Sequence, residues 1–363
     1  TLNAANNIFI NGLIFDSNTT DTPTDTNQDS LNLSLNANSG SGTVEITNNI
    51  FTRGGDITIN GDTTLDADVA LRTQGNGGGN ITFGGTVDGQ HNLTLNAGND
   101  GKNIIFNGAV GNNMALTGVN IERGTTTFNS TVKTAGDSGD TLGNITIDPN
   151  VTFKGNVITQ GGDITINGDT TLGANITLQS SIAEGGGDIT FNGTVNGPHN
   201  LNLGAGGGSI TFNGAVGSSP PPPNQSSPNI PLGSGTGAAI TIGGGTTTFN
   251  STLNTASHLT ITPNVTFTEK VTLGAEAPSP PSGEPPVMTK PPATTFGGQV
   301  TLKTLNFDSD ADITFNGNVT LEGGNSLLRT QTDEATITFN SNVEPNGHQL
   351  TLTANGIDFK NQN

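Results

Sequence analysis

The sequence predicts an all-β chain that forms a right-handed parallel β-helix, a β-solenoid whose coils contain about 19–25 residues. Three observations predict this fold class. Long segments of the chain repeat, apolar and polar residues alternate over short stretches, and equivalent stretches recur at a characteristic spacing. That spacing is too long for a hairpin loop and too short for a βαβ unit, which needs roughly 30 residues or more.

The repeats are visible as recurring sequence. The segment Gly54–Leu65 returns unchanged as Gly161–Leu172. A longer segment, Asn80–Ala97, returns with few changes as Asp188–Ala205 and, more altered, as Thr336–Ala354. Units in such an array pack only on their neighbours, so the 363 residues need not form two conventional domains.

Short strands are expected at the many apolar–polar–apolar triplets, such as Ile57–Ile59 and Ile189–Phe191. Alternation places the two apolar side chains on one face of a strand and the central Thr on the other. No apolar pattern with helical spacing is long enough to predict a helix. The predicted core ladder consists of Ile57, Ile59, Ile81, Phe83, Ile104, Phe106, Phe128, Ile164, Ile166, Ile189, Phe191, Ile210, Phe212, Phe249, Ile313, Phe315, Ile337 and Phe339.

Corners are expected where Asn–Gly or Asn–Ser follows a triplet, because these residues tolerate positive φ. A second short strand then follows, as at Thr194–Val195. The predicted corner residues are Asn60, Gly61, Asn107, Gly108, Asn167, Gly168, Asn192, Gly193, Asn213 and Gly214.

The spacing of equivalent strands predicts coils of two or three strands each. Stacked coils pair each strand in parallel with its copy one coil further on, at about 4.8 Å. Starting from Ile57, the predicted equivalents are Ile81, Ile104, Thr126, Ile145 and Ile164.

Three inserts interrupt the regular coils, and solenoids accept such inserts at their corners. Proline cannot donate to a strand ladder, so the two proline-rich inserts predict loops that leave the solenoid. They are either solvated surface loops or loops that bind a partner, with Pro220, Pro221, Pro222, Pro223, Pro280, Pro281, Pro285 and Pro286 as candidate contact residues. The predicted organisation is N-terminal coils at 1–50 with an acidic Thr/Asp loop at 16–30, regular coils at 51–217, a proline-rich loop at 218–231, coils at 232–276, a second proline-rich loop at 277–295 and C-terminal coils at 296–363.

Composition excludes several classes of partner. The net charge is −19, with only 11 Lys and Arg, so we expect no nucleic-acid binding and no attraction to anionic membranes. No apolar run approaches the roughly 18 residues of a spanning helix, so we expect no membrane insertion. The absence of Cys excludes disulfides and thiolate chemistry. The chain opens at Thr1 rather than Met, from which we expect a removed leader or a fragment.

No metal site is expected. His91, His199, His258 and His348 each precede a short strand, as one repeat position seen four times, and we expect their rings to bond to backbone groups at corners. His91 and His199 are about five coils apart, ~24 Å at the strand spacing, so they cannot share one ion. Asp-bearing turns such as Gly161–Asp163 lack the nine-residue spacing of calcium-binding solenoid repeats.

No catalytic residue and no cofactor are expected. Carbohydrate-active β-helices need clustered carboxylates, and the sequence offers no such pair in register. The glycine-rich runs lack a following helix, so they do not predict phosphate binding. A file of outward Thr side chains resembles the arrays of ice-binding solenoids, but the expected Thr-x-Thr pattern is absent. The predicted file consists of Thr58, Thr82, Thr146, Thr165, Thr190, Thr211, Thr314 and Thr338.

The segment Gly186–Gly217 resembles the repeats of filamentous-haemagglutinin-like proteins, which are large bacterial surface exoproteins of two-partner or autotransporter secretion. The resemblance extends over roughly residues 50–355. It implies a right-handed β-helix on or beyond the outer membrane that acts in adhesion, aggregation or matrix building. The family's N-terminal secretion module is not recognisable here.

These observations predict an extracellular, non-enzymatic structural protein of the bacterial cell surface. Neither end of the sequence predicts a capping helix, and open solenoid ends expose strand edges, so we expect head-to-tail stacking of copies. The alternative is a rod segment of a large secreted adhesin whose proline-rich loops bind a receptor on a host or neighbouring cell. A carbohydrate-active β-helix enzyme is the more distant alternative.

Overall fold

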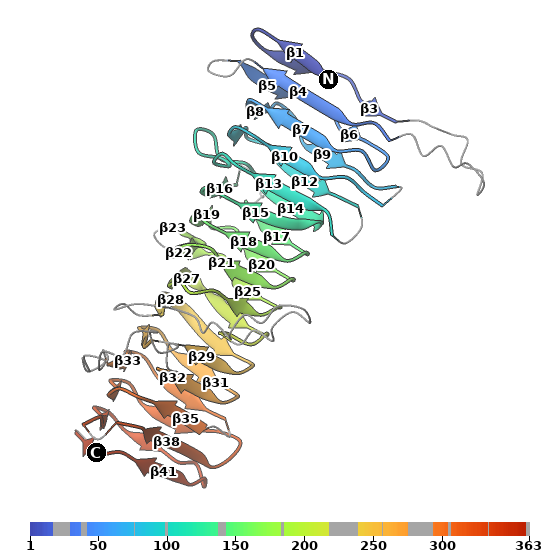
Figure 1. Cartoon of the computed structure of the whole chain (residues 1–363). Coiled ribbons are helices and arrows are strands. Elements are labelled where there is room, and N and C mark those ends of the chain that lie inside the picture. Colours follow the sequence, from blue (N-terminus) through green and yellow to red (C-terminus); the bar gives the residue numbers. More distant parts are fainter. Residues whose placement is uncertain are drawn as a thin grey trace, which may run out of the picture. The chain divides into compact units, whose positions relative to one another are not determined.

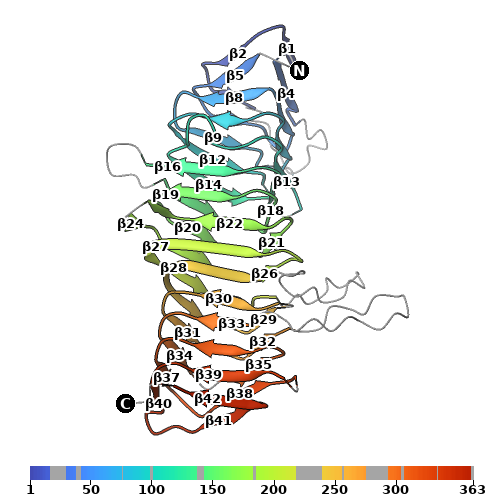
Figure 2. The same ribbon diagram turned by 90° about the vertical axis from the view of Figure 1, so that its left-hand side faces the viewer.

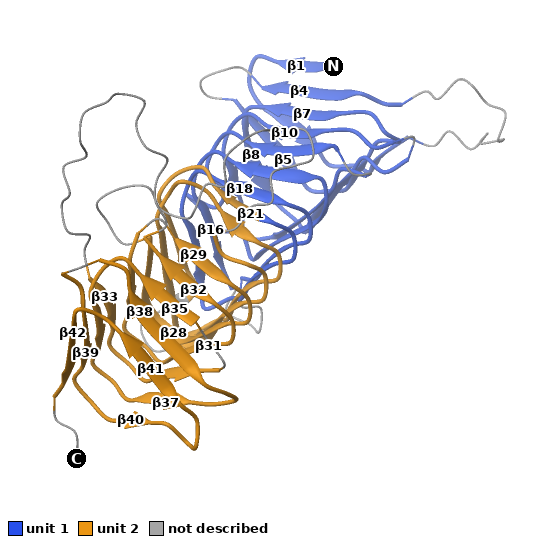
Figure 3. Ribbon diagram, turned by 60° about the horizontal axis from the view of Figure 1, so that its bottom comes forward, with its two compact units in different colours: residues 1–169 blue, residues 170–363 orange. Residues whose placement is uncertain are grey.

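The computed structural model describes residues 1–16, 30–37, 42–75, 77–98, 101–136, 143–182, 185–217, 239–255, 257–274, 293–303, 306–332 and 334–360. The chain forms two compact units, unit 1 (Thr1–Asp169) and unit 2 (Thr170–Asn363), which Figure 3 distinguishes by colour. The candidate contact residues in the proline-rich loops, and residues 17–29 of the acidic loop, lie outside the described residues.

Each unit is a parallel β-helix, which confirms the predicted fold class. Short strands alternate with corners, and the strands of successive coils within a unit pair in parallel (Figures 1 and 2). A complete coil holds three strands, each of which belongs to a different row of paired strands. The typical triplet has two buried residues that flank a half-buried one, as in β10 (Ile81–Phe83).

Unit 1 contains three rows of strands. The first row is β1 (Leu2–Ala4), β4 (Leu33–Ala37), β7 (Ile57–Asn60), β10, β13 (Asn103–Phe106), β15 (Thr125–Phe128) and β18 (Val151–Phe153). The second row is β2 (Ile8–Ile10), β5 (Thr43–Ile46), β8 (Asp62–Leu65), β11 (Val87–Asp88), a single bridge at Val110, β16 (Val132–Ala135) and β19 (Val157–Gln160). The third row is β3 (Ile14–Phe15), β6 (Ile50–Phe51), β9 (Val69–Arg72), β12 (Asn92–Asn96), β14 (Gly118–Arg123), β17 (Ile145–Ile147) and β20 (Ile164–Ile166).

Unit 2 also contains three rows, and two of its strands, β27 (Leu201–Phe212) and β28 (Ile240–Phe249), each pass through two of them. The first row is β21 (Thr170–Leu172), β26 (Val195–Asn196), a bridge at Val216, β29 (Leu253–Thr255), β32 (Val271–Leu273), β35 (Asn306–Ser309), β38 (Ser326–Thr330) and β41 (Leu350–Thr353). The second row is β22 (Ile176–Gln179), the first parts of β27 and β28, β30 (Leu259–Ile261), β33 (Thr294–Phe296), β36 (Ile313–Phe315), β39 (Thr336–Phe339) and β42 (Gly356–Phe359). The third row is β25 (Ile189–Phe191), the second parts of β27 and β28, β31 (Val265–Phe267), β34 (Val300–Leu302), β37 (Val319–Leu321) and β40 (Val343–Glu344). Outside the three rows, β23 (Ser181–Ile182) and β24 (Gly185–Gly186) pair as a small antiparallel hairpin.

The predicted register holds as far as Thr126 and is wrong at Ile145. Ile57, Ile81, Ile104 and Thr126 are successive partners in the first row of unit 1. Ile145 instead pairs with Val119 and Ile164 in the third row, and Val151 is the partner of Thr126. All three rows carry the same apolar–polar–apolar pattern, so the pattern cannot tell which row a triplet joins.

Stacked phenylalanine rings run through the core of each unit. All the residues of the predicted core ladder are at most 1% exposed. In unit 1, Phe83, Phe106, Phe128 and Phe153 stack with ring centroids 4.9, 4.7 and 5.6 Å apart. In unit 2 one stack runs through Phe191, Phe212, Phe249 and Phe267, and another through Phe296, Phe315, Phe339 and Phe359.

Glycine has a different role at the predicted corners from the one expected. Among the described residues, Asn346 is the only residue other than Gly with a positive φ, and none of the predicted corner glycines has one. A Cβ atom on Gly108 or Gly214 would lie 2.3 or 2.1 Å from a backbone oxygen of the preceding coil. Glycine is therefore required at these corners by the close approach of stacked coils, not by a left-handed backbone.

Candidate functional site

Acidic and amide side chains in front of the strands link neighbouring coils. The Oδ1 atom of Asp56 accepts the backbone N–H of Asn80 at 2.7 Å, and Asn80 in turn accepts that of Asn103 at 2.9 Å. Asp188 accepts the N–H of Ser209 at 2.7 Å in the same way. These oxygens therefore satisfy backbone donors, and the described part of the chain contains no group of three or more His, Cys, Asp or Glu that could hold a metal ion.

The corner asparagines form a second link between coils. The Nδ2 atom of Asn213 donates to Oδ1 of Asn192 at 2.7 Å, and Asn250 donates to Asn213 at 2.8 Å. The same contact joins Asn60 to Asn36 at 2.7 Å. An amide can donate and accept at once, which a carboxylate cannot do, so Asn is required wherever a side chain does both. Asp148 can only accept, and it does so from Asn167 at 2.6 Å. The repeated Asn after each triplet is the sequence signal for this Asn ladder.

Buried hydroxyl groups make a further set of contacts, within the turn that follows a strand, and these were not predicted from the sequence. Thr73 Oγ1 donates to the backbone oxygen of Gly79 at 2.7 Å, and Ser309 Oγ donates to that of Ala311 at 3.1 Å. Ser180 makes the corresponding bond to Gly187. A Thr or Ser at an otherwise apolar inward position, shortly before the next strand, would have indicated these contacts.

The histidines do not behave as one repeat position. His91 lies 3.7 Å from Asp68 through its Nδ1 atom, and His258 contacts Ser257 Oγ at 3.1 Å through its own Nδ1 atom. The expected bonds from these two rings to backbone groups are therefore absent from the interactions among the described residues. The N–H of Asn92 lowers the pKa of Asp68, with smaller contributions from the Asn92 side chain and His91, while burial opposes the shift. Burial lowers the pKa of His258.

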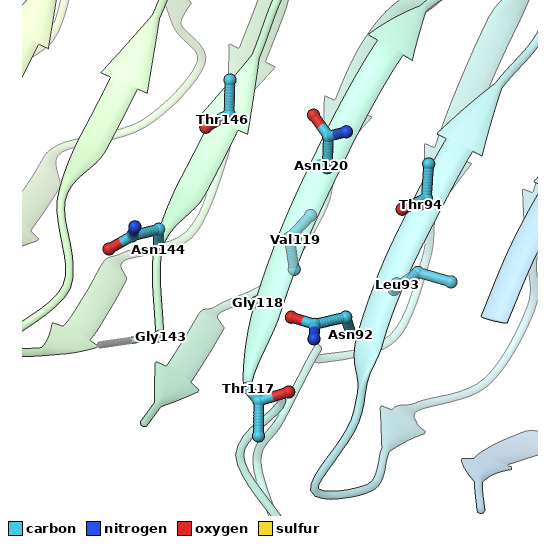
Figure 4. A pocket seen from close by; sticks show the side chains of 10 residues that line it. All are labelled: Asn92, Leu93, Thr94, Thr117, Gly118, Val119, Asn120, Gly143, Asn144 and Thr146. Carbon is cyan, nitrogen blue, oxygen red and sulfur yellow. The ribbon is translucent and has the colours of Figure 1, made fainter. Parts of the chain in front are cut away.

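A shallow groove lies on the outward side of β12, β14 and β17 in unit 1 (Figure 4). It has a volume of about 350 Å³ and is lined only by uncharged residues. Thr94, Asn120 and Thr146 occupy one outward position in successive strands. Gly118 leaves room beside Asn92, because a Cβ there would lie 2.5 Å from Asn92 Oδ1. The groove offers hydroxyl and amide groups but contains no acid, base or nucleophile pair for catalysis.

A larger hollow of about 550 Å³ lies over β3, β6 and β9. Phe15 and Phe51 meet edge to face there, with ring centroids 6.3 Å apart. Arg72 also lines this hollow, and its Nη2 atom lies 2.9 Å from Glu122 Oε1. Glu122 therefore already neutralises this guanidinium, and the hollow has no uncompensated charge from Arg72.

A buried aspartate, Asp308, contacts two partly exposed cations in unit 2. The side chain of Asp308 is only 5% exposed and lies 3.0 Å from Arg329 Nη2 and 3.4 Å from Lys270 Nζ. Asp308 is therefore compensated by two half-exposed cations, and only the loss of both would leave its buried charge without a partner. Burial raises the pKa of the nearby Asp310.

The predicted Thr file is divided among several rows. Thr58 and Thr82 lie in the first row of unit 1, whereas Thr146 and Thr165 lie in its third row. In unit 2, Thr190 and Thr211 share the third row, while Thr314 and Thr338 share the second. The prediction that these eight residues line one flank is therefore wrong, and they do not form the single Thr array that the comparison with ice-binding solenoids requires.

The first described coil of unit 1 and the last described coil of unit 2 expose some apolar side chains whose partners in the neighbouring coil are buried, although Ile8 and Ile10 in the first coil are themselves buried. Leu2 is 48% exposed, although its row partner Leu35 is fully buried. Ile357 and Phe359 are 43% and 47% exposed, although Ile337 and Phe339 are fully buried.

Among the described residues we find no helical segment with the length and hydropathy of a membrane span. Comparisons with protein-family models, with curated proteins and with solved structures each gave no match.

Proposed function

We propose that this chain is a non-enzymatic structural protein whose β-helix stacks end to end with further copies to build a filament or matrix fibre at a bacterial cell surface. The observation that carries the proposal is the exposure of the core columns at Leu2, Ile357 and Phe359. Large exposed apolar patches mark interaction surfaces, and unpaired strand edges template the addition of further strands.

The geometry of the two outermost coils supports a second copy as the partner. The first coil of unit 1 consists of β1, β2 and β3, and the last described coil of unit 2 of β40, β41 and β42, so each of these coils presents one strand from each of three rows. The Phe339 and Phe359 rings stack at 4.8 Å, which is the spacing a further coil would continue. A head-to-tail contact between unlike ends does not close on itself, and it therefore produces a fibre.

Electron microscopy across a concentration series tests this proposal, with Ile357→Lys as the disrupting variant. We expect the unaltered chain to form fibres with a ~4.8 Å axial repeat and the variant to remain as single folded particles. The matched control is Thr351→Lys in the same coil, because Thr351 is exposed on the opposite side of its strand from the half-buried Leu352. Single particles of the unaltered chain at every concentration would overturn the proposal, and so would equal loss of fibres in both variants.

The resemblance to filamentous-haemagglutinin-like proteins supports an extracellular location and a role in adhesion or matrix building. It rests on repeats such as Gly186–Gly217, which the structure places in parallel β-helical coils. Self-association and attachment to a host or neighbouring cell are both compatible with this architecture, and the absence of Cys agrees with a chain that holds together without disulfides.

The second candidate function is attachment through the proline-rich inserts of a longer adhesin. The coils on both sides of the two proline-rich loops, at 218–231 and 277–295, would then serve as a scaffold. Deleting each insert separately should abolish binding to cells while leaving the circular dichroism spectrum and the melting temperature unchanged. Unaltered binding in both deletions would exclude this candidate.

A further inference from the structure

We propose that Asn355 is a site of spontaneous deamidation, and that the Asn ladder protects the equivalent Asn–Gly pairs inside the coils. Asn–Gly pairs occur at corners throughout the chain, including Asn213–Gly214 and Asn355–Gly356. Their different surroundings determine how readily each can react.

The reaction is an intramolecular attack by a backbone nitrogen on a side-chain amide. The nitrogen of Gly356, after loss of its proton to hydroxide, forms a bond to Cγ of Asn355. The Cγ–Nδ2 bond breaks, and the amide nitrogen leaves as ammonia with a proton from water. Water then opens the resulting succinimide to give aspartate or isoaspartate. The step needs no cofactor, but Cγ must first rotate towards the glycine nitrogen, so any contact that holds the amide slows it.

The ladder holds the amide of Asn213 on both sides. Its Nδ2 atom donates to Asn192 at 2.7 Å, and its Oδ1 atom accepts from Asn250 at 2.8 Å. Rotation of Cγ towards Gly214 would break both hydrogen bonds. Asn60 is held from one side, through its bond to Asn36.

Asn355 has no such contact. It lies in the bend between β41 and β42, and no hydrogen bond with another described residue reaches its side chain. Asn355, Asn213 and Asn60 are all exposed to solvent. Exposure therefore does not distinguish these three residues, whereas the ladder does.

The other Asn–Gly pairs of the outermost coils are intermediate cases. Asn346 precedes Gly347, and its Nδ2 atom donates to the backbone oxygen of Leu321 at 3.2 Å. Asn11 precedes Gly12 and accepts a long hydrogen bond of 3.4 Å from Thr47 Oγ1. Each has one contact to break, so both should react more slowly than Asn355.

The test is incubation of the full chain at alkaline pH, followed over time by peptide mapping with mass spectrometry and by an isoaspartate assay. We expect Asn355 to convert before Asn213, with Asn213 roughly 5- to 30-fold slower, as expected for breaking one or two hydrogen bonds. The same chain in denaturant is the control, because unfolding should bring the two rates close together. Equal rates at both positions in the folded chain would overturn the proposal.

Two ladder variants sharpen the test, and each is the other's control. Asn192→Ala should raise the conversion rate at Asn213 and leave Asn60 unchanged, whereas Asn36→Ala should raise it at Asn60 and leave Asn213 unchanged. Gly356→Ala should slow conversion at Asn355, because the added methyl group hinders the attacking nitrogen. If neither ladder variant alters its neighbour while the chain stays folded, hydrogen bonding in the ladder is not what protects these residues.

Discussion

The two phenylalanine stacks of unit 2 have similar ring spacings and different surroundings. In the stack from Phe191 to Phe267 all the rings are at most 1% exposed, with centroids 4.6–5.2 Å apart. The stack from Phe296 to Phe359 has spacings of 4.8–5.2 Å, but its last ring is 47% exposed. Burial in this fold is therefore a property of having a coil on both sides and not of the triplet sequence alone.

The two stacks meet at a cluster of three rings. Phe307 lies edge to face with Phe267 at 5.9 Å and with Phe296 at 6.0 Å, and those two rings lie 5.8 Å apart. The stack thus changes from the third row of unit 2 to the second at this point, and Phe307 in the first row fills the space between them.

The largest expected effect is a difference in stability between two Phe→Ala variants, one in the middle of the first stack and one at the end of the second. Phe212→Ala should destabilise the fold by about 3–5 kcal/mol, because it removes a buried ring and leaves a cavity. Phe359→Ala should cost much less, since that ring is already half exposed. Urea denaturation of both variants measures the difference in the free energy of unfolding. Equal destabilisation would show that a ring with a coil on only one side contributes as much as a ring with a coil on both sides.

A smaller loss of stability is expected from Gly→Ala substitutions at corners that follow a ring of each stack, and here the two stacks should behave alike. Gly214→Ala and Gly317→Ala would place a Cβ 2.1 and 2.3 Å from a backbone oxygen of the preceding coil, Gly193 and Gly298 respectively. Overpacking of this kind should destabilise each variant by about 1–3 kcal/mol. Gly243→Ala is the matched control, because no atom lies within 4 Å of its added Cβ. Thermal melting of the three variants should separate the corner glycines from Gly243.

Removing a buried hydroxyl group next to the ring cluster should have a still smaller effect. Ser309 Oγ donates to the backbone oxygen of Ala311 and accepts the Ala311 N–H, both at 3.1 Å. Ser309→Ala should cost about 1 kcal/mol. Ser309→Thr keeps the hydroxyl and should restore most of that loss. Hydrogen exchange at Ala311 gives a local readout, and unchanged protection in Ser309→Ala would show that the hydroxyl does not hold this turn.

The smallest expected effect is a pH dependence with opposite signs at two aspartates. The N–H of Asn92 is the main cause of the lowered pKa of Asp68. The Asp68 carboxylate therefore stabilises the fold fully at pH values above its ordinary pKa of 3.8. This contribution is lost as the pH falls through the lowered pKa of the folded state. Burial raises the pKa of Asp310, near the ring cluster, so its charged form opposes folding at neutral pH and stability is regained as pH falls through the raised value.

Asp310→Asn should therefore raise the melting temperature at neutral pH, with a gain that shrinks in acid. Asp68→Ala should lower it at neutral pH, with a loss that also shrinks in acid. Melting curves at several pH values check both signs. A gain for Asp310→Asn that grows as pH falls would contradict the assigned direction.

The fold was predictable because local pattern and global architecture agree at the triplets. Pairs such as Ile189 and Phe191 alternate with Thr, and their repeats lie at the spacing of stacked coils. The row to which Ile145 belongs was not predictable, since all rows share one pattern. The Asn ladder was missed because it depends on which polar atoms meet across coils far apart in sequence, as Asn250 meets Asn213. The hydroxyl contacts are local, as between Ser309 and Ala311, and were missed because Thr and Ser at inward positions fit the apolar pattern of the strands poorly.

The phenylalanine stacks also determine how the molecule interacts with light. The chain contains 16 Phe but no Trp and no Tyr, so phenyl rings are its only aromatic side-chain chromophores apart from the weakly absorbing imidazoles. A single Trp introduced at any one position would be the only indole in the protein. Replacing Phe212 or Phe359 in separate variants would thus give an emission signal that reports on one coil at a time, without background from the rest of the chain.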